Sequence, residues 1–243
     1  MRDLFLIDSK VTYLNHGSYG ACPKSVFKDY QNFQKKLEKQ PVQFMTKHLW
    51  KNLKITRDTL ADFIKCDGAD ILLFPNPTTA VNNIFENLDI VEGDEVLTTQ
   101  HEYGALIRAW SRLAVRKKFS FIQQKIDLPL DSKKKFIHQF CSGINESTKI
   151  IFISHITSQT ALILPIEEIC EIAKSKDIIT IIDGAHAPGH IDLDISQIGC
   201  DYYTGACHKW MCAPKGSSFL YVAKNFQKGM SPQIMSWGEE GDD

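Results

Sequence analysis

Residues 178–193, IITIIDGAHAPGHIDL, begin with five β-branched residues and then place an aspartate, a glycine and a histidine in quick succession. A short apolar run that ends near glycine and proline is typical of a buried strand. Asp183 would close this strand, and His186 would lie in the turn that follows. A second segment, TGACHKWMCAPKG at 204–216, then brings Lys209 next to a histidine. The sequence therefore predicts a strand end that carries chemically reactive side chains.

Apolar runs of this kind recur along the chain, and helix-like segments separate several of them. The predicted strands are 71–74, 95–99, 119–124, 149–156, 178–183 and 217–223, and the predicted helices between them are 78–88, 104–118 and 165–176. Strands that alternate with helices favour an α/β domain, whose mainly parallel sheet has helices on both faces. Segments 23–40 and 45–66 have apolar residues at helical spacing. We therefore expect a helical segment, residues 1–70, that packs on an α/β large domain, residues 71–243.

The composition excludes several classes of protein. With Lys+Arg 28 against Asp+Glu 29, the net charge is -1, which offers no electrostatic attraction to nucleic acid or to an anionic membrane. We find no apolar run of transmembrane length and no signal-peptide pattern, so we expect a soluble protein. The seven cysteines are scattered and form no CxxC motif, which argues against a metal site. Reduced thiols of this kind predict a cytoplasmic protein.

Polar residues follow the carboxyl ends of several predicted strands. In an open parallel sheet these ends lie at one edge, where ligands bind. Thr78 and Thr79 follow the first strand and begin a helix, whose free N–H groups suit a phosphate, although N-capping by threonine is the simpler interpretation. Tyr103 follows the second strand, and Ser158 follows the fourth. These residues, with Asp183, are candidates for a shared binding site.

Each reactive residue also has an ordinary structural alternative. Asp183 can cap a turn, His186 can be a buried core histidine, and Lys209 can be solvated. Their convergence on one sheet edge favours the chemistry of pyridoxal 5'-phosphate (PLP). A lysine can form a Schiff base with the PLP aldehyde, and a carboxylate can keep the pyridine nitrogen protonated. An aromatic ring can cover the pyridine, and a helix N-terminus can hold the phosphate.

Five ordered motifs carry a resemblance to a known family. The longest is DGAHAPGHIDLDISQIGCDYYTGACHKWMCAPKGSSFLYV, at 183–222. The others are YLNHGSYGACP at 13–23, NPTTAVNN at 76–83, HEYGALIRAW at 101–110 and SHITSQTALILP at 154–165. Together they resemble the class V aminotransferases, a fold-type I PLP-dependent group, and most closely its isopenicillin N epimerase-like branch, which is related to the cysteine desulfurases.

This resemblance implies a role for each candidate residue. Lys209 would carry the cofactor and move the proton at the substrate α-carbon, Asp183 would pair with the pyridine nitrogen, and His186 would lie near the cofactor O3′. The remaining implied cofactor contacts are Thr78 and Thr79 with the His208 side chain at the phosphate, Tyr103 on the ring face, and Ser158 in place of an asparagine of the desulfurases. Asn15, His16 and Gly17 would line the substrate entrance.

The sequence departs from the family pattern at two places. Ala206 stands where relatives carry a serine or asparagine, which removes one expected hydrogen bond to the phosphate. The chain ends at SWGEEGDD, whereas relatives continue into a smaller domain that carries the arginine for the substrate carboxylate, so we expect this small domain to be absent. Arg108, Arg112 and Arg116 recur at helical spacing and predict a solvated helix face instead.

The resemblance therefore implies a PLP-dependent enzyme that acts at the α-carbon of an amino acid, in the manner of isopenicillin N epimerase. The predicted class is aminotransferase class V or epimerase-like. One alternative is a lyase of the cysteine desulfurase or desulfhydrase type. Another is a truncated chain that binds cofactor or a partner with little turnover. The resemblance also implies a homodimer, since relatives place the site at a twofold interface.

Overall fold

The structure, a computed structural model, describes residues 1–234, and within them seven strands form one mixed sheet. The spatial order is β1-β7-β6-β5-β4-β2-β3. In chain order the strands are β1 (Ile71–Phe74), β2 (Glu95–Thr99), β3 (Ser120–Gln124), β4 (Thr148–Ser154), β5 (Ile179–Asp183), β6 (Tyr202–Ala206) and β7 (Ser218–Val222). Neighbours from β3 to β6 are parallel, while β7 runs antiparallel to both β6 and β1. The predicted mainly parallel α/β sheet is confirmed.

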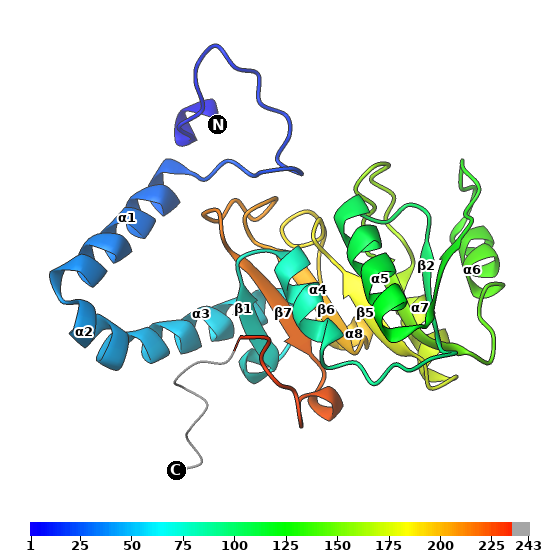
Figure 1. The fold of residues 1–243 in the computed structure, drawn as a ribbon. Helices are drawn as coiled ribbons and strands as arrows, with labels where there is room; N and C mark the ends of the chain where they lie inside the picture. Colours follow the sequence, from blue (N-terminus) through cyan, green and yellow to red (C-terminus); the bar gives the residue numbers. More distant parts are fainter. Residues whose placement is uncertain (235–243) are drawn as a thin grey trace.

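Eight α-helices surround or extend from this sheet within the described chain (Figure 1). They are α1 (Lys24–Lys39), α2 (Pro41–Gln43), α3 (Leu49–Ile64), α4 (Pro77–Phe85), α5 (Gly104–Lys117), α6 (Lys133–Cys141), α7 (Ile166–Lys174) and α8 (Ile195–Ile198). A π-helical turn, Phe44–His48, leads from α2 into α3. The helices predicted at 78–88, 104–118 and 165–176 correspond to α4, α5 and α7.

The helices cover both faces of the sheet and create two separate hydrophobic cores. On one face, α4 and α5 pack against the strands around Trp110, which is completely buried and lies 4.5 Å from the Phe85 ring, centroid to centroid. On the other face, α3, α6, α7 and α8 cover the strands. Because both faces are buried, the central strands read as continuous apolar runs, which is the pattern that revealed them in the sequence.

The register of the central strands aligns polar residues at one edge. Ser154 pairs with Asp183 across β4 and β5, and Asp183 pairs with Thr204 across β5 and β6. These strands are parallel, so their carboxyl ends open on the same side and their following loops lie together. The sheet thus creates the binding edge that the sequence predicted.

The first 70 residues contact the α/β domain at only some points. Figure 1 shows α1 extending away from the sheet, and no residue of α1 is buried. In α3, Leu60, Ala61 and Ile64 enter the core below the sheet. The segment before α1, which we call the N-terminal arm (residues 1–23), returns to the sheet edge, where the Gly20 amide donates to the His208 carbonyl at 2.9 Å. Among the described helices, none is long and apolar enough to cross a membrane.

Candidate functional site

A pocket of about 610 Å³ lies at the carboxyl edge of the parallel strands. Most of the predicted site residues line it: Gly17, Thr78, Thr79, Tyr103, Ser158, Asp183, His186, His208 and Lys209. They come from six separate segments of the chain, five of which follow the end of a strand, while Gly17 belongs to the segment before α1. The pocket is therefore a product of the sheet topology, and it gathers residues up to nearly two hundred positions apart.

Asp183 ends β5 and forms the floor of this pocket, with only 4% of its surface exposed. Its Oδ1 accepts the Ala185 amide at 3.0 Å, and we find no protein partner for Oδ2 among residues 1–234. Burial raises the pKa of Asp183, while the Ala185 amide and the Lys209 charge act in the opposite direction. A buried carboxylate with one unpartnered oxygen at a pocket surface is suited to hold a cationic N–H group.

Lys209 and His186 meet across the pocket. Lys209 Nζ lies 3.1 Å from His186 Nε2, in the loops that follow β6 and β5. Burial lowers the pKa of Lys209, and the nearby Asp183 carboxylate opposes that change. Burial, with the charges of Lys209 and His190, lowers the pKa of His186 to about 4. The lysine therefore lies in surroundings that favour its neutral, nucleophilic form.

The N-terminus of α4 borders the other end of the pocket. Asn76 is the N-cap, and its Oδ1 accepts the Thr79 amide at 2.8 Å and the Thr79 hydroxyl at 3.1 Å. The threonine capping considered from the sequence is therefore performed by Asn76. We find no protein acceptor for the Thr78 hydroxyl among residues 1–234, so Thr78 and the helix dipole remain available to an anion. 

His208 lies near the same end but has one nitrogen committed to the protein. Its Nδ1 donates to the Ser217 carbonyl at 2.8 Å, because a carbonyl can only accept. Nε2 then donates to a ligand only when the ring is an imidazolium. Ala206 is fully buried in β6 and contributes no polar group to the site, in agreement with the departure noted in the sequence.

Tyr103 and Ser158 line the pocket from its rim. Tyr103 is the residue before α5 and is 47% exposed, so its ring is free to cover a flat ligand. Ser158 is exposed in the loop after β4. Both side chains can reach a bound group without losing an existing protein contact.

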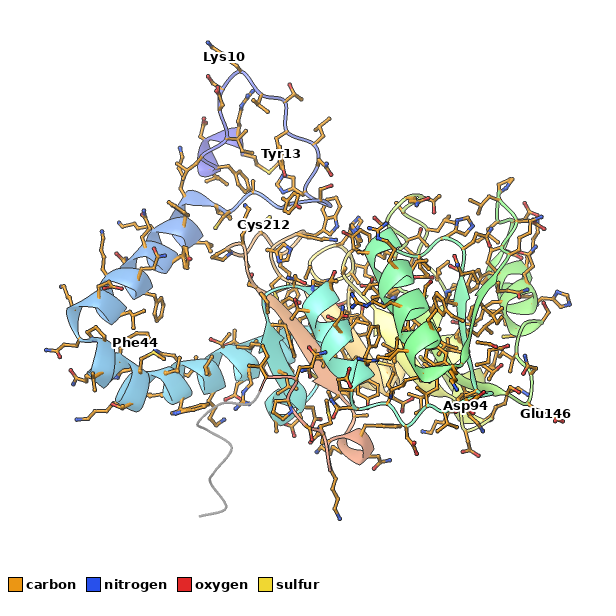
Figure 2. The ribbon with its side chains drawn as sticks, in the orientation of Figure 1. Lys10, Tyr13, Phe44, Asp94, Glu146 and Cys212 are labelled. Atoms are coloured by element: carbon orange, nitrogen blue, oxygen red, sulfur yellow. The ribbon has the colours of Figure 1, made fainter. Side chains whose placement is uncertain are left out.

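Of the three arm residues predicted at the substrate entrance, Gly17 lines the pocket, and the neighbouring Ser18 and Tyr19 line it as well. A Cβ at Gly17 would lie 3.1 Å from the Trp210 ring and 3.5 Å from the His186 ring, so a glycine allows the arm to approach both. His16 stacks on Trp210 instead, with ring centroids 6.4 Å apart. Asn15 is exposed, and its Oδ1 accepts the Ser18 amide at 3.2 Å. Figure 2 shows Tyr13 of this arm on the side of the molecule that carries Cys212, in the loop after Lys209.

A second buried carboxylate, Glu102, escaped the sequence analysis. It is 2% exposed, and its oxygens accept the Thr99 hydroxyl at 2.6 Å and the Ser154 amide at 2.9 Å. Burial raises the pKa of Glu102 to about 7, and the Asp183 charge adds to this effect, although the hydrogen bonds oppose it. The signal was an acidic residue directly before Tyr103 at the end of a strand, but a loop glutamate is ordinarily solvated.

Trp210 is the other residue that the sequence analysis missed. Its Nε1 donates to His186 Nδ1 at 3.3 Å, and its ring stacks on His190 with centroids 4.3 Å apart. The available signal was its position next to Lys209. A tryptophan near a strand end more often belongs to a core, and only the fold brings the histidine loop against it.

The structure contains no arginine in the pocket lining and no cluster of metal-ligating side chains, among the residues it describes. Arg108, Arg112 and Arg116 lie on the exposed face of α5, as predicted, and Arg116 pairs with Glu86 at 2.5 Å. Cys207 is buried and Cys212 is half-buried, and neither lines the pocket. 

Comparison with known proteins gives a consistent result. The family model described as Aminotransferase class-V matches residues 12–239. Isopenicillin N epimerase of Streptomyces clavuligerus is 35% identical over 240 residues, and L-cysteine desulfhydrase of Arabidopsis thaliana is 27% identical over 229 residues. A solved structure of a C-DES mutant with glycine covalently linked to its PLP cofactor superposes with a TM-score of 0.87 at 24% identity. This superposition confirms the fold-type I architecture.

The lengths of the matched regions differ between this chain and its relatives. The matches cover 98%, 88% and 98% of this chain, respectively, but only 60%, 50% and 63% of the three other proteins. The chain thus spans about half to three fifths of the length of these relatives.

Proposed function

Because the chain belongs to the class V aminotransferase family, we propose that it binds PLP and acts at the α-carbon of an amino acid. The observation that supports this proposal is the convergence of Asp183, His186 and Lys209 in one pocket, with the N-terminus of α4 at its other end. Burial of Asp183 and Lys209 costs free energy that a bound ligand can offset.

The residues present fit this cofactor. The unpartnered Oδ2 of Asp183 would accept the N–H of the pyridine ring, and Lys209 Nζ would attach to the aldehyde carbon. Thr78 and the α4 N-terminus would hold the phosphate, with His208 beside them. Tyr103 would cover the ring, while His186 and Ser158 would bind its oxygen substituent. 

Each residue then has a defined chemical role. When bound, PLP supplies an electron sink that makes the α-proton of an attached amino acid acidic. Asp183 keeps the pyridine nitrogen protonated, which the sink requires. Burial lowers the pKa of Lys209, which favours the amine form that could remove a proton at the α-carbon and return it.

We favour epimerase-like chemistry over the alternatives. The isopenicillin N epimerase relative is 35% identical, against 27% for the desulfhydrase, which supports proton removal and return at one carbon. A desulfhydrase-type lyase is the second candidate, since it needs the same first step. The third is a cofactor-binding chain of low turnover, which is supported by the lack of an arginine in the pocket lining of the described chain.

A homodimer is also part of the proposal, and cytoplasmic localisation stays a prediction. Val26, Tyr30 and Phe33 form one stripe of α1 at helical spacing and are 38%, 42% and 47% exposed. A stripe of this kind is suited to pack against a second copy of the chain. If it does, Phe33→Glu will shift the mass seen by light scattering from dimer to monomer, whereas Val115→Glu on exposed α5 will not. A monomeric parent protein contradicts the proposal.

The proposed function can be tested with the full chain and PLP. Borohydride reduction should fix one PLP per chain to the peptide that contains Lys209, and Lys209→Ala should abolish this adduct while the exposed control Lys228→Ala retains it. With amino acids in deuterated water, NMR should then detect loss of the α-proton signal, and chiral analysis or sulfide release separates epimerase from lyase. An adduct on another lysine would contradict the assignment of the site.

A further inference from the structure

Two hydrogen bonds use both nitrogens of the same imidazole ring. Trp210 Nε1 lies 3.3 Å from His186 Nδ1, and Lys209 Nζ lies 3.1 Å from His186 Nε2. Trp210 and Lys209 are consecutive in the chain, but their side chains approach His186 from opposite sides of the ring. The side chains of Trp210, His186 and Lys209 therefore form a continuous series of contacts that ends at the Lys209 amine in the pocket.

The donor and acceptor groups of the three side chains determine where the protons lie. An indole N–H can only donate, so His186 Nδ1 must accept. A neutral imidazole carries a single proton, which must then lie on Nε2. His186 is neutral at ordinary pH, since its pKa is lowered to about 4. The Nε2 proton therefore points at Lys209 Nζ, and the amine must be the acceptor.

We propose that Trp210 is a positioning residue that fixes the Nε2–H tautomer of His186 and thereby holds Lys209 as a neutral amine. An ammonium group has three donors and no acceptor, so it would face the His186 N–H donor to donor. With the opposite tautomer, His186 would accept from an ammonium and stabilise it. The indole thus selects between two protonation states of a lysine that it does not itself contact through a hydrogen bond.

Aromatic stacking holds the indole in the orientation that this role requires. The His190 ring lies on Trp210 at 4.3 Å with an interplanar angle of 27°, and His16 of the N-terminal arm stacks at 6.4 Å and 26°. His190 Nδ1 donates to the His186 carbonyl at 3.1 Å, which ties the stacked ring to the same loop. The N-terminal arm and the loop after β5 therefore both fix the direction of the indole N–H.

Other ionisable groups also act on Lys209. The Asp183 carboxylate favours the ammonium, whereas burial favours the neutral amine and dominates, so the pKa of Lys209 is lowered. The remaining titratable groups around the pocket or against Trp210 are His16, Tyr19, Glu102, Tyr103, His190 and His208. Replacing Trp210 leaves all of them in place, so a change in Lys209 can be attributed to the tautomer.

The test uses the protein without cofactor, so it is independent of the proposed function. Nitrogen-15 NMR of labelled histidine should report the Nε2–H tautomer for His186 in the parent chain. The reactivity of the Lys209 amine is then measured by competitive acetylation and mass spectrometry over pH 6–10. Trp210→Phe keeps the stacking surface and removes the donor. It should shift His186 toward mixed tautomers and slow acetylation of Lys209 at neutral pH about fivefold, the effect of one net hydrogen bond.

Matched variants make the result specific. Trp50→Phe, a change at a residue 72% exposed on α3, should leave both measurements unchanged. In a His186→Gln background, Trp210→Phe should no longer slow acetylation, since an amide can present either a donor or an acceptor. Circular dichroism identifies any variant that fails to fold. In that case the nitrogen-15 NMR spectrum of the parent chain alone decides whether the proposed tautomer is present. An Nδ1–H tautomer in the parent, or an unchanged Lys209 rate in Trp210→Phe, overturns the proposal. Expected NMR results with no PLP binding would contradict only the proposed function.

Discussion

Glu102 Oε2 accepts two hydrogen bonds from one residue, the amide of Ser154 at 2.9 Å and its hydroxyl at 2.5 Å. Ser154 is the register partner of Asp183 on the neighbouring strand. A second buried carboxylate therefore lies one strand away from the carboxylate on the pocket floor. The Asp183 charge adds to the effect of burial and raises the pKa of Glu102 further.

The first prediction concerns Glu102 and the free energy of unfolding. Its pKa is raised to about 7 in the folded protein from 4.5, so the unfolded chain ionises first as the pH rises. The folded state binds the extra proton, and stability should fall between about pH 4.5 and 7, by on the order of 3 kcal/mol from this group. Glu102→Gln should remove that part of the decline.

Urea unfolding at pH 5 and pH 7.5 measures this effect. Glu146→Gln, which changes an exposed glutamate labelled in Figure 2, is the matched control and should keep the parent pH dependence. If the Glu102→Gln and parent curves run parallel over this range, Glu102 is ionised at ordinary pH and does not contribute to the decline.

The second prediction concerns His155, which responds to pH in the opposite direction. Burial lowers its pKa to about 4 from 6.5, and its Nδ1 lies 2.8 Å from the Tyr203 hydroxyl. The unfolded chain therefore takes up a proton first as the pH falls, and stability should be lost between about pH 6.5 and 4. The expected loss from His155 is on the order of 3 kcal/mol, and His186 adds to it in the same range.

Replacement of His155 by Gln should flatten the acid side of the stability curve, although the variant itself will be less stable at pH 7. The measurement is again urea unfolding, between pH 7 and pH 4.5. His138→Gln, a change in helix α6, provides the comparison. If the free energy of unfolding falls as steeply with acid in His155→Gln as in the parent, other groups cause the loss of stability.

The third prediction concerns Asp183 and applies to the PLP-loaded protein. Asp183→Asn should still bind the cofactor but slow α-proton exchange in deuterated water roughly 100-fold or more. The substitution removes the negative charge that faces the pyridine nitrogen, where electron density accumulates when the α-proton leaves. Asp192→Asn, at a position whose side chain is 92% exposed, should exchange at the parent rate. If Asp183→Asn exchanges the α-proton at the parent rate, Asp183 has no role in the chemistry and only accepts the Ala185 amide.

The fourth prediction concerns the contact between the N-terminal arm and the lysine loop. Gly20 is buried, its amide donates to the His208 carbonyl, and a Cβ there would overlap the Lys209 carbonyl. Gly20→Ala should therefore displace the arm and cost about 1–3 kcal/mol, as overpacking does elsewhere. Limited proteolysis should cut the arm faster. In contrast, Gly104→Ala meets only the Arg108 side chain at 3.7 Å and should leave the proteolysis rate unchanged.

Local sequence patterns predicted much of the fold and many of the residues that line the pocket. The β-branched run before Asp183 predicted β5, because a strand buried on both faces must be apolar throughout. Helix α6 was missed because its sequence, KKKFIHQFC, begins with three lysines and has only two buried residues, Phe136 and Phe140. The antiparallel direction of β7 could not be predicted either, because it depends on which strands β7 pairs with, and β1 is distant in the sequence.

The residues missed in the site share one physical property. Glu102 acts through Ser154, 52 residues away, and Trp210 acts through His186, 24 residues away. Each pair is brought together by the fold and not by a local sequence periodicity. The resemblance placed Asn15 and His16 at the substrate entrance, and that role stays a prediction. In the structure Asn15 is exposed and His16 stacks on Trp210.

The position of β7 has a consequence for the order of assembly during synthesis. Within the described sheet, β1 pairs only with β7, and the two strands are about 150 residues apart in the chain. The turn that begins α4 follows directly from β1, so the strand that leads into this turn gains its sheet partner after residues 218–222 have emerged from the ribosome. Closing so long a loop is slow and entropically costly. The nascent chain therefore presents Asp183 and the parallel strands around it before β7 is available to pair with β1, so the β1 side of the pocket is completed after the Asp183 side.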